Sequence, residues 1–498
     1  MQEIFRISKG EFELANRDDK SLLLKNNLLP LIHNEEEGLG VDSSNYAAPL
    51  AFISCYSENE KIFFLDSEMY ENLYTKSLEL KKDTEEDEIF EDDDDSDIMD
   101  MLQNRQDLLT SEESAPVIQF VNRVFYQAVK RGASDIHIEP YRDRSVIRFR
   151  VDGVLQKYVD IPKGATNGII NRVKVISHLD ISEKRVPQDG RTQITIGGVN
   201  LDIRVSSIPS HFGERIVMRV LMQTESIPTL DDLGLDSTIS EQMKSLIKNP
   251  HGIILVTGPT GSGKSTTLYS MLQMKKNSEV NIMTIEDPVE YNLEGISQTQ
   301  VNTKAGLTFA SGLRSILRQD PDVILIGEMR DKETSSIAIQ SSLTGHLVFS
   351  TLHTNDSASS ITRLVDLGVE RYLVASSLLA VLAQRLVRVL CDECKKKRVV
   401  DEFEAKLLGI DKSQEVYDAH GCEACSNSGF KGRKAVGELL LIDSKIKEMI
   451  TSAKDDAFVK EYAINHLGLR TLKDSALELL KEGRTTVDEV VKVSMESK

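Results

Sequence analysis

Apolar and polar residues follow different patterns in different parts of the chain. From about residue 237, short apolar runs alternate with stretches of helical periodicity, which is typical of a parallel sheet covered by helices on both faces. The apolar runs predict strands at 253–256, 282–285, 323–326 and 347–350. The stretch that follows the first run, STTLYSMLQMKK at 265–276, predicts a helix.

The part from about residue 113 to 222 predicts a helix combined with a sheet. Apolar residues recur at helical spacing, and Gly132 is placed to end that helix. They are Val117, Phe120, Val121, Val124, Phe125 and Ala128. Alternation of apolar and polar residues then predicts half-buried strands at 134–140, 145–155, 199–209 and 213–221.

The two ends of the chain carry weaker signals. Residues 1–80 mix short apolar runs with polar turns and predict a small α/β module without a chemical motif. At the other end, 467–483 predicts a helix that closes on Gly483. Thr486 and Glu489 then predict a capping box for a last helix.

The charge of the chain is concentrated in one segment. Residues 83–100 contain 12 acidic residues and no basic one, so they carry −12 of the net charge of −19. Such a run repels itself, and 81–112 is therefore predicted to be a flexible solvated linker, with an acidic docking tail as the alternative. No positive excess remains to follow nucleic acid, which argues against a helicase or a DNA translocase.

Nothing in the sequence predicts export or a membrane span. The N-terminus lacks the apolar core of a signal peptide, and no apolar run reaches the about 18 residues that a spanning helix needs. We therefore expect a cytoplasmic protein that reaches a membrane only through a partner.

The most informative motif is GPTGSGKS at 258–265, which fits the phosphate-binding pattern G-x-x-x-x-G-K-[ST]. Its glycines let the backbone turn so that N–H groups face a polyphosphate, Lys264 places positive charge on the β- and γ-phosphates, and the Ser265 hydroxyl can ligate Mg²⁺. A strand enters the loop and a helix leaves it, which favours an NTPase over a glycine-rich turn that binds nothing. The predicted nucleotide-binding residues are Gly258, Pro259, Thr260, Gly261, Ser262, Gly263, Lys264, Ser265 and Thr266.

Further candidates follow from the rule that ligands of a parallel sheet collect at the carboxyl ends of its strands. Glu286 follows the second predicted strand, Glu328 the third and His353 the fourth, so we expect them to converge near the phosphate loop. Three polar residues precede their strands and are expected to be structural: Asp320, Asp322 and His346.

Four of the five cysteines form two C-x-x-C pairs, Cys391/Cys394 and Cys422/Cys425. In a reducing compartment such pairs favour a tetrahedral structural Zn²⁺ over disulfides. The 27 residues between the pairs exceed the usual spacing, so a redox pair or a site that has lost its metal stays open as an alternative.

Taken together, these segments resemble the secretion ATPases that drive type II secretion and type IV pilus assembly. The resemblance covers about 110–498 and includes, besides the phosphate loop, RFRVDGVL (148–155), TIEDPVEY (284–291), LRQDPDVILIGEMRD (317–331) and TGHLVFSTLHTND (344–356). It implies an α/β fold in which a PAS-like α+β domain precedes a RecA-like P-loop NTPase core, and a homohexameric ring as the working form.

The implied domains are an N-terminal docking module (1–80), a linker (81–112), the PAS-like domain (113–222), a hinge (223–236), the ATPase core (237–390), a tetracysteine zinc subdomain (391–433) and a C-terminal helical region (434–498).

The resemblance also implies roles for single residues. Glu328 would orient the attacking water, Glu286 of the so-called aspartate box would help hold metal or water, and His353 lies in the histidine box. Arg204 and Arg219 would reach the γ-phosphate when the domains close, although from the residues alone a solvated sheet face is the default interpretation of any single one of these arginines.

Within the family the chain most resembles the type II secretion ATPases, because of its short N-terminal module and the serine that ends its phosphate loop. This implies ATP as substrate, Mg²⁺ and Zn²⁺ as metals, and a platform protein of the inner membrane as the partner of residues 1–80. The alternatives are an ATPase for pilus extension or a competence pseudopilus, and a nucleotide-dependent scaffold that does not hydrolyse. Pilus retraction is disfavoured by the tetracysteine element.

Overall fold

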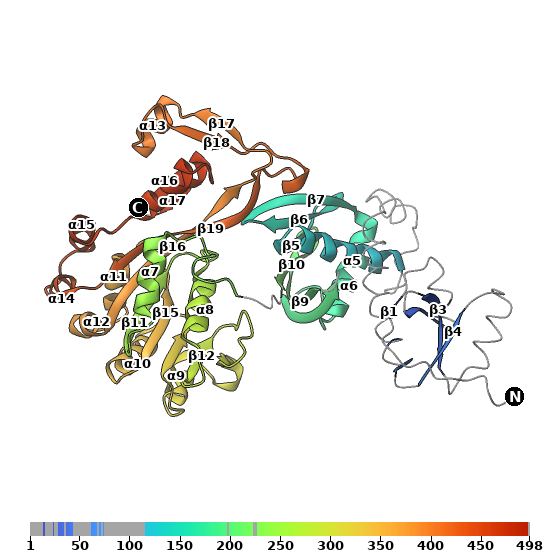
Figure 1. Ribbon diagram of the computed structural model, residues 1–498, viewed down its shortest axis with the longest axis horizontal. Helices are drawn as coiled ribbons and strands as arrows, with labels where there is room; N and C mark the ends of the chain where they lie inside the picture. Colours follow the sequence, from blue (N-terminus) through green and yellow to red (C-terminus); the bar gives the residue numbers. More distant parts are fainter. Residues whose placement is uncertain are drawn as a thin grey trace. The chain divides into compact units, whose positions relative to one another are not determined.

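The computed structural model describes residues 13–14, 23, 28–33, 36–42, 61–66, 69–70, 73, 115–196, 199–222 and 227–496 (Figure 1). The predicted acidic linker at 81–112 and the first part of the predicted hinge, 223–226, lie outside these residues. Near the N-terminus, short strands form a sheet in the order β1 (Glu13–Leu14), β2 (Leu29–His33), β3 (Glu36–Asp42) and β4 (Ile62–Leu65). Leu29, Leu31 and Leu65 form part of its buried core.

A six-stranded sheet follows, in the order β7-β6-β5-β10-β9-β8. The chain divides into two compact units, and the division runs through this sheet. Its elements are α5 (Ala115–Lys130), β5 (Ala133–Pro140), β6 (Arg144–Val151), β7 (Val154–Pro162), α6 (Lys163–Ile176), β8 (Gln188–Ile196), β9 (Val199–Ser210) and β10 (Gly213–Met222).

The predicted helix of this part is confirmed as α5. All six apolar residues that predicted it are buried, and the chain leaves the helix through Gly132, whose φ is +64°. The single strand predicted at 145–155 is wrong, because Asp152 and Gly153 both have positive φ and turn the chain between β6 and β7. An Asp-Gly pair is a strong hairpin signal, so the sequence did contain this information.

The C-terminal part is built on a seven-stranded sheet in the order β13-β12-β14-β15-β11-β16-β19. The strands are β11 (Gly252–Thr257), β12 (Ile282–Glu286), β13 (Ser297–Gln300), β14 (Val323–Ile326), β15 (Leu347–Leu352), β16 (Leu378–Leu390) and β19 (Phe430–Leu441). Pairing is parallel up to β16, and β19 joins β16 in the antiparallel direction. The four predicted strands are confirmed as β11, β12, β14 and β15.

Helices cover both faces of this sheet, which explains why its strands are continuous apolar runs. Ile253 and Leu255 face one helical layer, whereas Ile254 and Val256 face the other. The first layer contains α9 (Phe309–Ile316), α10 (Lys332–Leu343), α11 (Ser359–Asp366), α12 (Arg371–Ser377), α14 (Ser444–Thr451) and α15 (Asp456–Leu467). The second contains α7 (Ser237–Leu246) and α8 (Lys264–Lys275).

The last part of the chain packs on β16 and β19 through a separate apolar cluster. It comprises β17 (Lys396–Val399), α13 (Glu402–Leu408), β18 (Glu415–Asp418), α16 (Leu472–Lys481) and α17 (Val487–Glu496). The helix predicted at 467–483 begins later than expected, because Gly468 ends α15 in a left-handed conformation and Thr471 caps the start of α16.

The predicted capping box of α17 is half present. The N–H of Glu489 donates to the Thr486 hydroxyl at 3.4 Å. The Glu489 carboxylate, however, accepts from the backbone N–H and the guanidinium of Arg388 on β16, at 2.9–3.1 Å. The Glu489 carboxylate therefore pairs with Arg388, a charged residue far along the chain, instead of capping the start of α17 as the local motif predicts.

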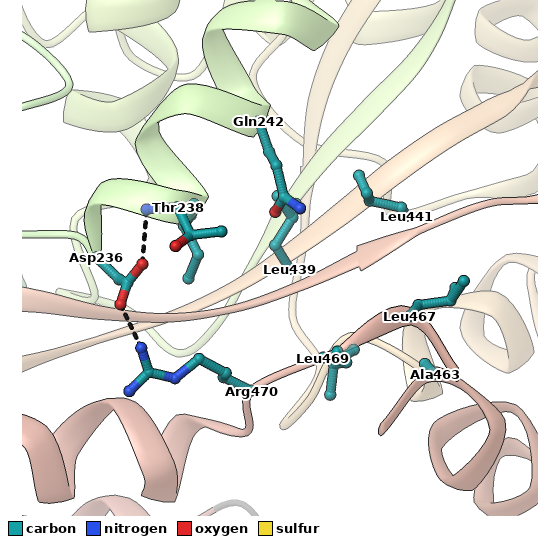
Figure 2. A pocket seen from close by; sticks show the side chains of 11 residues that line it. Asp236, Thr238, Gln242, Leu439, Leu441, Ala463, Leu467, Leu469 and Arg470 are labelled. Atoms are coloured by element: carbon teal, nitrogen blue, oxygen red, sulfur yellow. Dashed lines mark hydrogen bonds and ion pairs between the residues drawn. The ribbon is translucent and has the colours of Figure 1, made fainter. Parts of the chain in front are cut away.

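One arginine ties the segment between α15 and α16 to helix α7 (Figure 2). The Asp236 carboxylate caps α7 by accepting the Thr238 N–H at 2.7 Å, and it also accepts from the Arg470 guanidinium. Beside this pair, Leu439, Leu441 and Leu469 line a small cavity. Within the described part of the chain, no helix is both long and apolar enough to cross a membrane.

Candidate active site

The phosphate-binding loop lies between β11 and α8, as its sequence predicts. Gly258, Gly261 and Gly263 have φ values of +149°, +79° and +86°, which glycine adopts readily and other residues rarely do. Gly263 caps the first turn of α8, so the helix N-terminus faces the loop. The Lys264 ammonium donates to the carbonyl oxygens of Gly258 and Pro259, both at 2.9 Å.

A buried glutamine on β16 holds this loop from behind. The Gln384 side chain, 1% exposed, donates to the Ser262 carbonyl at 2.8 Å and accepts from the Thr267 hydroxyl at 2.8 Å. A Cβ added at Gly258 would lie 2.5 Å from the backbone carbonyl oxygen of Gln384, so the main chain of β16 also packs closely against the loop. Sequence reasoning missed Gln384, although one amide inside an apolar strand indicates a specific buried partner.

The ends of three neighbouring strands bring Glu328 and His353 together. Strand pairing continues past β14, because the Gly327 N–H donates to the Ile285 carbonyl at 2.8 Å and the Met329 N–H donates to the Thr351 carbonyl at 3.2 Å. Glu328 is 8% exposed, and its carboxylate lies 3.6 Å from His353 Nε2.

An arginine that sequence reasoning did not single out completes this group. The Arg330 guanidinium lies 2.6 Å from the other oxygen of the Glu328 carboxylate. Arg330 follows the same strand end as Glu328 with one residue between them, so the strand-end rule itself would have selected it. The buried carboxylate is thus held between a guanidinium and an imidazole.

Electrostatics connect Glu328 and His353 to the phosphate loop. Burial lowers the pKa of Lys264 to about 8, with nearby Glu328 opposing the shift and Arg385 adding to it. Burial also lowers the pKa of His353, and the positive charge of Lys264 lowers it further. His353 is therefore a neutral imidazole at pH 7, and Lys264 lies where added negative charge would be stabilised.

Glu286 lies at the end of β12 and has hydrogen-bond partners separate from those of Glu328 and His353. Its carboxylate is 5% exposed and accepts from the hydroxyls of Thr284, at 2.6 Å, and Tyr269, and from the Gln298 amide at 3.2 Å. Tyr269 belongs to α8, so Glu286 is joined to the helix that starts at the phosphate loop. Burial and Glu286 together raise the pKa of Tyr269, which therefore stays a hydroxyl donor.

The residues that precede their strands make structural contacts. The Asp322 carboxylate accepts the Asn281 N–H at 2.7 Å, and the Asn281 amide donates to the Asp320 carbonyl at 2.8 Å. His346 Nδ1 lies 2.8 Å from the Ser341 carbonyl oxygen. These contacts tie strand starts to preceding segments.

The two predicted arginines lie on the six-stranded sheet, Arg204 on β9 and Arg219 on β10. Arg219 lies 3.3 Å from the Asp135 carboxylate, and Arg150 lies 3.6 Å from the same group. These contacts fit the interpretation of a solvated sheet face with ion pairs. The exposed guanidinium of Arg219 also remains accessible to a second anionic group.

The four cysteines of the two pairs form one cluster. Their sulfur atoms all lie within 4.8 Å of one another, and three of the separations are 3.7, 3.8 and 3.9 Å. A tetrahedron with Zn–S bonds of about 2.3 Å has edges of about 3.8 Å, so the cluster fits a four-coordinate zinc ion.

Backbone N–H groups point at these sulfur atoms. Gly421 N–H donates to the Cys394 sulfur at 3.3 Å, and the N–H groups of Cys422 and Gly429 donate to the Cys425 sulfur at 3.2 Å. Burial opposes ionisation of Cys425, but the N–H groups of Cys422 and Gly429, together with the neighbouring thiols of Cys422 and Cys394, outweigh it and lower the pKa of its thiol to about 6. Burial and the neighbouring thiols instead raise the pKa of Cys422. Thiolate is the form that binds a metal.

The chain is similar in sequence to known proteins of one family. Residues 110–492 match the family model described as "Type II/IV secretion system protein". The type II secretion system ATPase E of Vibrio cholerae serotype O1 is 49% identical over 400 residues, which cover 80% of this chain and 79% of that protein. The type IV pilus assembly ATPase PilB of Thermus thermophilus is 46% identical over 382 residues, which cover 76% of this chain and 43% of that protein.

Solved structures show the same fold. The pilus retraction motor PilT with bound ADP aligns with a TM-score of 0.51 and 26% identity, over 75% of this chain and 96% of that chain. The Legionella pneumophila ATPase DotB aligns with a TM-score of 0.56 and 23% identity, over 76% and 95%. The predicted α/β P-loop NTPase fold and the predicted family are confirmed: the chain belongs to the family of type II/IV secretion system proteins.

Proposed function

We propose that this protein is the ATPase motor of a type II secretion system, which hydrolyses ATP to power pseudopilus assembly and protein export. The observation that carries the proposal is the placement of Glu328 and His353 at the strand ends beside a complete phosphate loop. The identity of 49% to a type II secretion ATPase supports the choice of system.

Binding of ATP begins with the phosphate loop. Its N–H groups and the N-terminus of α8 receive the phosphates. Lys264 exchanges its two carbonyl partners for phosphate oxygens, and the negative charge restores the pKa that burial lowers. Mg²⁺ supplies positive charge to the β- and γ-phosphates when bound, and the exposed hydroxyl of Ser265 in the first turn of α8 would hold it.

Hydrolysis then needs an oriented water and little covalent help from the protein. Glu328 is the proposed water-orienting acid, because its carboxylate is buried, held by Arg330 and adjacent to His353. Neutral His353 can donate to the γ-phosphate or to the water. Glu286 keeps α8 in place through Tyr269 and supports the metal side of the site.

We further propose that the protein works as a homohexameric ring at the cytoplasmic face of the inner membrane. Domain closure would bring Arg204 and Arg219 of the 113–222 domain to the γ-phosphate and convert turnover into rigid-body motion. Residues 1–80 would dock the ring onto an inner-membrane platform protein, and the linker at 81–112 would let the ring move beneath that anchor.

A pilus-extension or competence pseudopilus ATPase is the second candidate, favoured by the 46% identity to a pilus assembly ATPase. A scaffold that does not hydrolyse is disfavoured, because a water-orienting acid, Glu328, is present at the strand end.

We also propose that the cysteine cluster holds one structural Zn²⁺ through Cys391, Cys394, Cys422 and Cys425. The ion would close the segment 391–433 at its two ends. Its role is to fix local structure, since all four coordination positions are taken by protein.

Two substitutions separate binding from cleavage. Lys264→Ala should abolish turnover and weaken nucleotide binding, because it removes the charge on the β- and γ-phosphates. Glu328→Gln should spare binding but lower kcat by about a hundredfold or more, the effect expected for loss of a general base. Steady-state phosphate release and binding of a fluorescent ATP analogue measure the two effects. Hydrolysis by Glu328→Gln at the parent rate would show that another group orients the water.

Two glycines of the loop form a matched pair. A Cβ at Gly258 would meet Gln384 and Ser262 at 2.5 and 2.6 Å, whereas one at Gly261 would meet nothing within 4 Å. An alanine at either position would carry the strain of a positive φ, about 1–3 kcal/mol. Gly258→Ala should therefore weaken nucleotide binding by about tenfold more than Gly261→Ala, as titration with the analogue would measure. Equal effects would mean that contact with Gln384 does not shape the loop.

The zinc proposal predicts about one zinc ion per chain in elemental analysis. Cys422→Ser should remove the ion and expose 391–433 to proteolysis, while the phosphate loop still binds nucleotide. Metal-free parent protein with the melting profile of freshly purified protein would contradict a structural ion.

Deletion of residues 1–80 tests the docking proposal. The truncated chain should still bind ATP, because the phosphate loop and every other residue proposed to contact nucleotide lie beyond residue 80, but it should leave the membrane fraction of cells. The parent chain and Lys264→Ala, both with an intact N-terminal module, serve as controls. A truncated chain that sediments with membranes as well as its parent would place the docking role in another part of the protein.

A further inference from the structure

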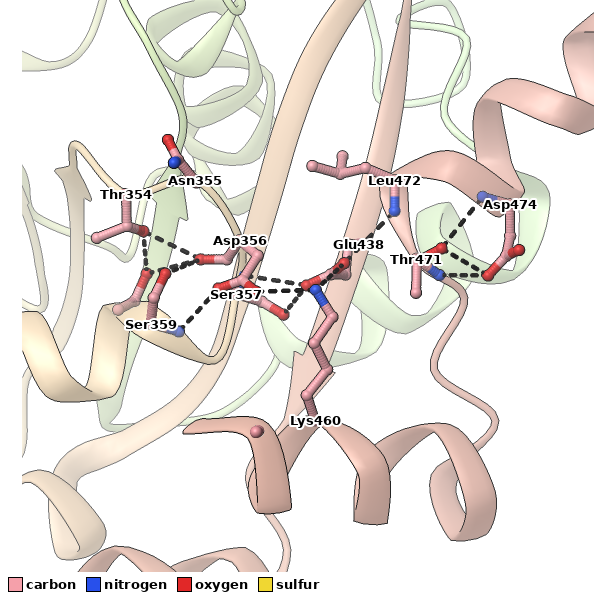
Figure 3. A network of polar contacts seen from close by, with 12 residues as sticks. Thr354, Asn355, Asp356, Ser357, Ser359, Glu438, Lys460, Thr471, Leu472 and Asp474 are labelled. Carbon is pink, nitrogen blue, oxygen red and sulfur yellow. Dashed lines mark hydrogen bonds and ion pairs between the residues drawn. The ribbon is translucent and has the colours of Figure 1, made fainter. Parts of the chain in front are cut away.

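The loop that carries His353 is fastened to the C-terminal helices by a buried polar network (Figure 3). The loop, 353–358, joins β15 to α11. The carboxylate of Asp356 accepts the Ser359 N–H at 2.9 Å with one oxygen and lies 2.8 Å from the Lys460 ammonium with the other. Lys460 belongs to α15, about a hundred residues further along the chain.

A fully buried carboxylate completes the network. Glu438 on β19 has 0% exposure, and one oxygen accepts from the Ser357 N–H at 3.0 Å and from the Ser357 hydroxyl at 2.6 Å. Its other oxygen lies 3.2 Å from the Lys460 ammonium and accepts the Leu472 N–H, at the start of α16, at 3.4 Å. Lys460 therefore contacts two carboxylates, one on the histidine loop and one on the sheet.

The opposite end of the loop touches the phosphate site. The Thr354 and Thr257 hydroxyl oxygens lie 2.7 Å apart, and the Thr354 N–H donates to Thr257 at 2.9 Å. Thr257 is the residue that precedes the phosphate loop. The Arg385 guanidinium donates to the Asn355 carbonyl at 3.1 Å. His353 is thus the first residue of a loop that contacts β11, the strand before the phosphate loop, at one end and α15 at the other.

Both partners of the Asp356–Lys460 ion pair are ionised although they are partly buried. Burial opposes ionisation of both partners, yet the Lys460 contact and the Ser359 hydrogen bonds lower the pKa of Asp356, and the two carboxylates raise the pKa of Lys460. Both groups are therefore charged at pH 7. Loss of Lys460 would leave the carboxylates of Asp356 and Glu438 without their shared cation, and loss of the Asp356 charge would leave Lys460 paired with Glu438 alone, so either change removes the ion pair that holds the loop to α15.

We propose that Lys460 is a positioning residue for ATP hydrolysis: through Asp356 and Glu438 it makes the position of helix α15 set the position of His353 beside Glu328. The inference rests on the proposed ATPase function and adds a second control point to it. A partner or a neighbouring subunit that displaces α15 would change the cleavage rate without touching nucleotide.

The test compares Asp356→Asn and Lys460→Met in the full-length chain. The amide introduced by Asp356→Asn can still accept the Ser359 N–H, and the Lys460–Glu438 pair survives, so this variant is expected to fold. Both variants should lower kcat by about tenfold or more, because a misplacement near 1 Å at a reacting group costs up to about a hundredfold. The dissociation constant for a fluorescent ATP analogue should stay within about twofold, since the phosphate loop is intact. Lys460→Arg should recover part of the lost rate.

A double variant and an activity-independent measurement identify the cause. If both changes act through one contact, the double variant should be no slower than the slower single variant. Hydrogen exchange at the amides of Thr354 and Ser357 should be faster in both variants than in the parent, with or without nucleotide. Lys454→Met, which changes an exposed lysine just before α15, is the matched control and should leave kcat and exchange unchanged.

The kcat of each variant is compared with the kcat of the parent protein. The parent rate tests the proposed ATPase function, and the ratio of variant to parent kcat tests the positioning role. Parent-like kcat and parent-like exchange in folded Asp356→Asn and Lys460→Met would overturn the positioning role. A loss of kcat that equals the loss of folded protein, measured by thermal melting, or of nucleotide binding would also overturn it.

Discussion

Parallel pairing of β12, β14, β15 and β11 is the constraint on which the rest of the structure depends. It brings the carboxyl ends of these strands to one edge of the sheet, where Glu286, Glu328, His353 and the phosphate loop follow in spatial order. Neighbouring strands lie about 4.8 Å apart, so residues far apart in the chain reach one another with short side chains. Glu286, Glu328 and His353 therefore need no long flexible side chain to reach the site. Lys264, which binds the phosphates, is the exception.

The same edge of the sheet is stabilised by buried polar groups that form hydrogen bonds with one another instead of with water. Gln384 donates to the phosphate loop, and Thr257 accepts from the Thr354 N–H. Glu438 accepts from the N–H groups of Ser357 and Leu472 and pairs with Lys460. A buried polar group without a partner costs about 1–3 kcal/mol, so each of these contacts also excludes other loop positions. Apolar side chains would give comparable stability through packing, but they would not fix where a backbone N–H points. Hydrogen bonds of this kind are what a phosphate site requires.

Elements that depend on local sequence could be predicted, whereas contacts between distant segments could not. The strand at 323–326 and the loop at 258–263 are determined by apolar runs and glycine spacing, and the structure has them where the sequence puts them. Gln384 and Lys460 were missed because their partners lie about a hundred residues away and no pattern links them. Glu489 is the opposite case. The local sequence predicts a capping box there, but the Glu489 carboxylate pairs with the distant Arg388 instead.

The surroundings of Glu328 also show how misleading the net charge of the chain is. The protein carries −19 overall, yet Lys264 is influenced by Arg385 and Glu328, and His353 by Lys264, Arg330 and Glu328, so three cations and one carboxylate act within the site. Glu328 and Arg385 are buried, and charges in a medium of low polarity interact over longer distances than in water. A polyphosphate entering the loop therefore meets a positive field, although a distant anion meets a negative protein. Most of that negative charge lies in residues 83–100, which supply none of the groups of the proposed site, so the net charge of the chain does not describe the field at the phosphate loop.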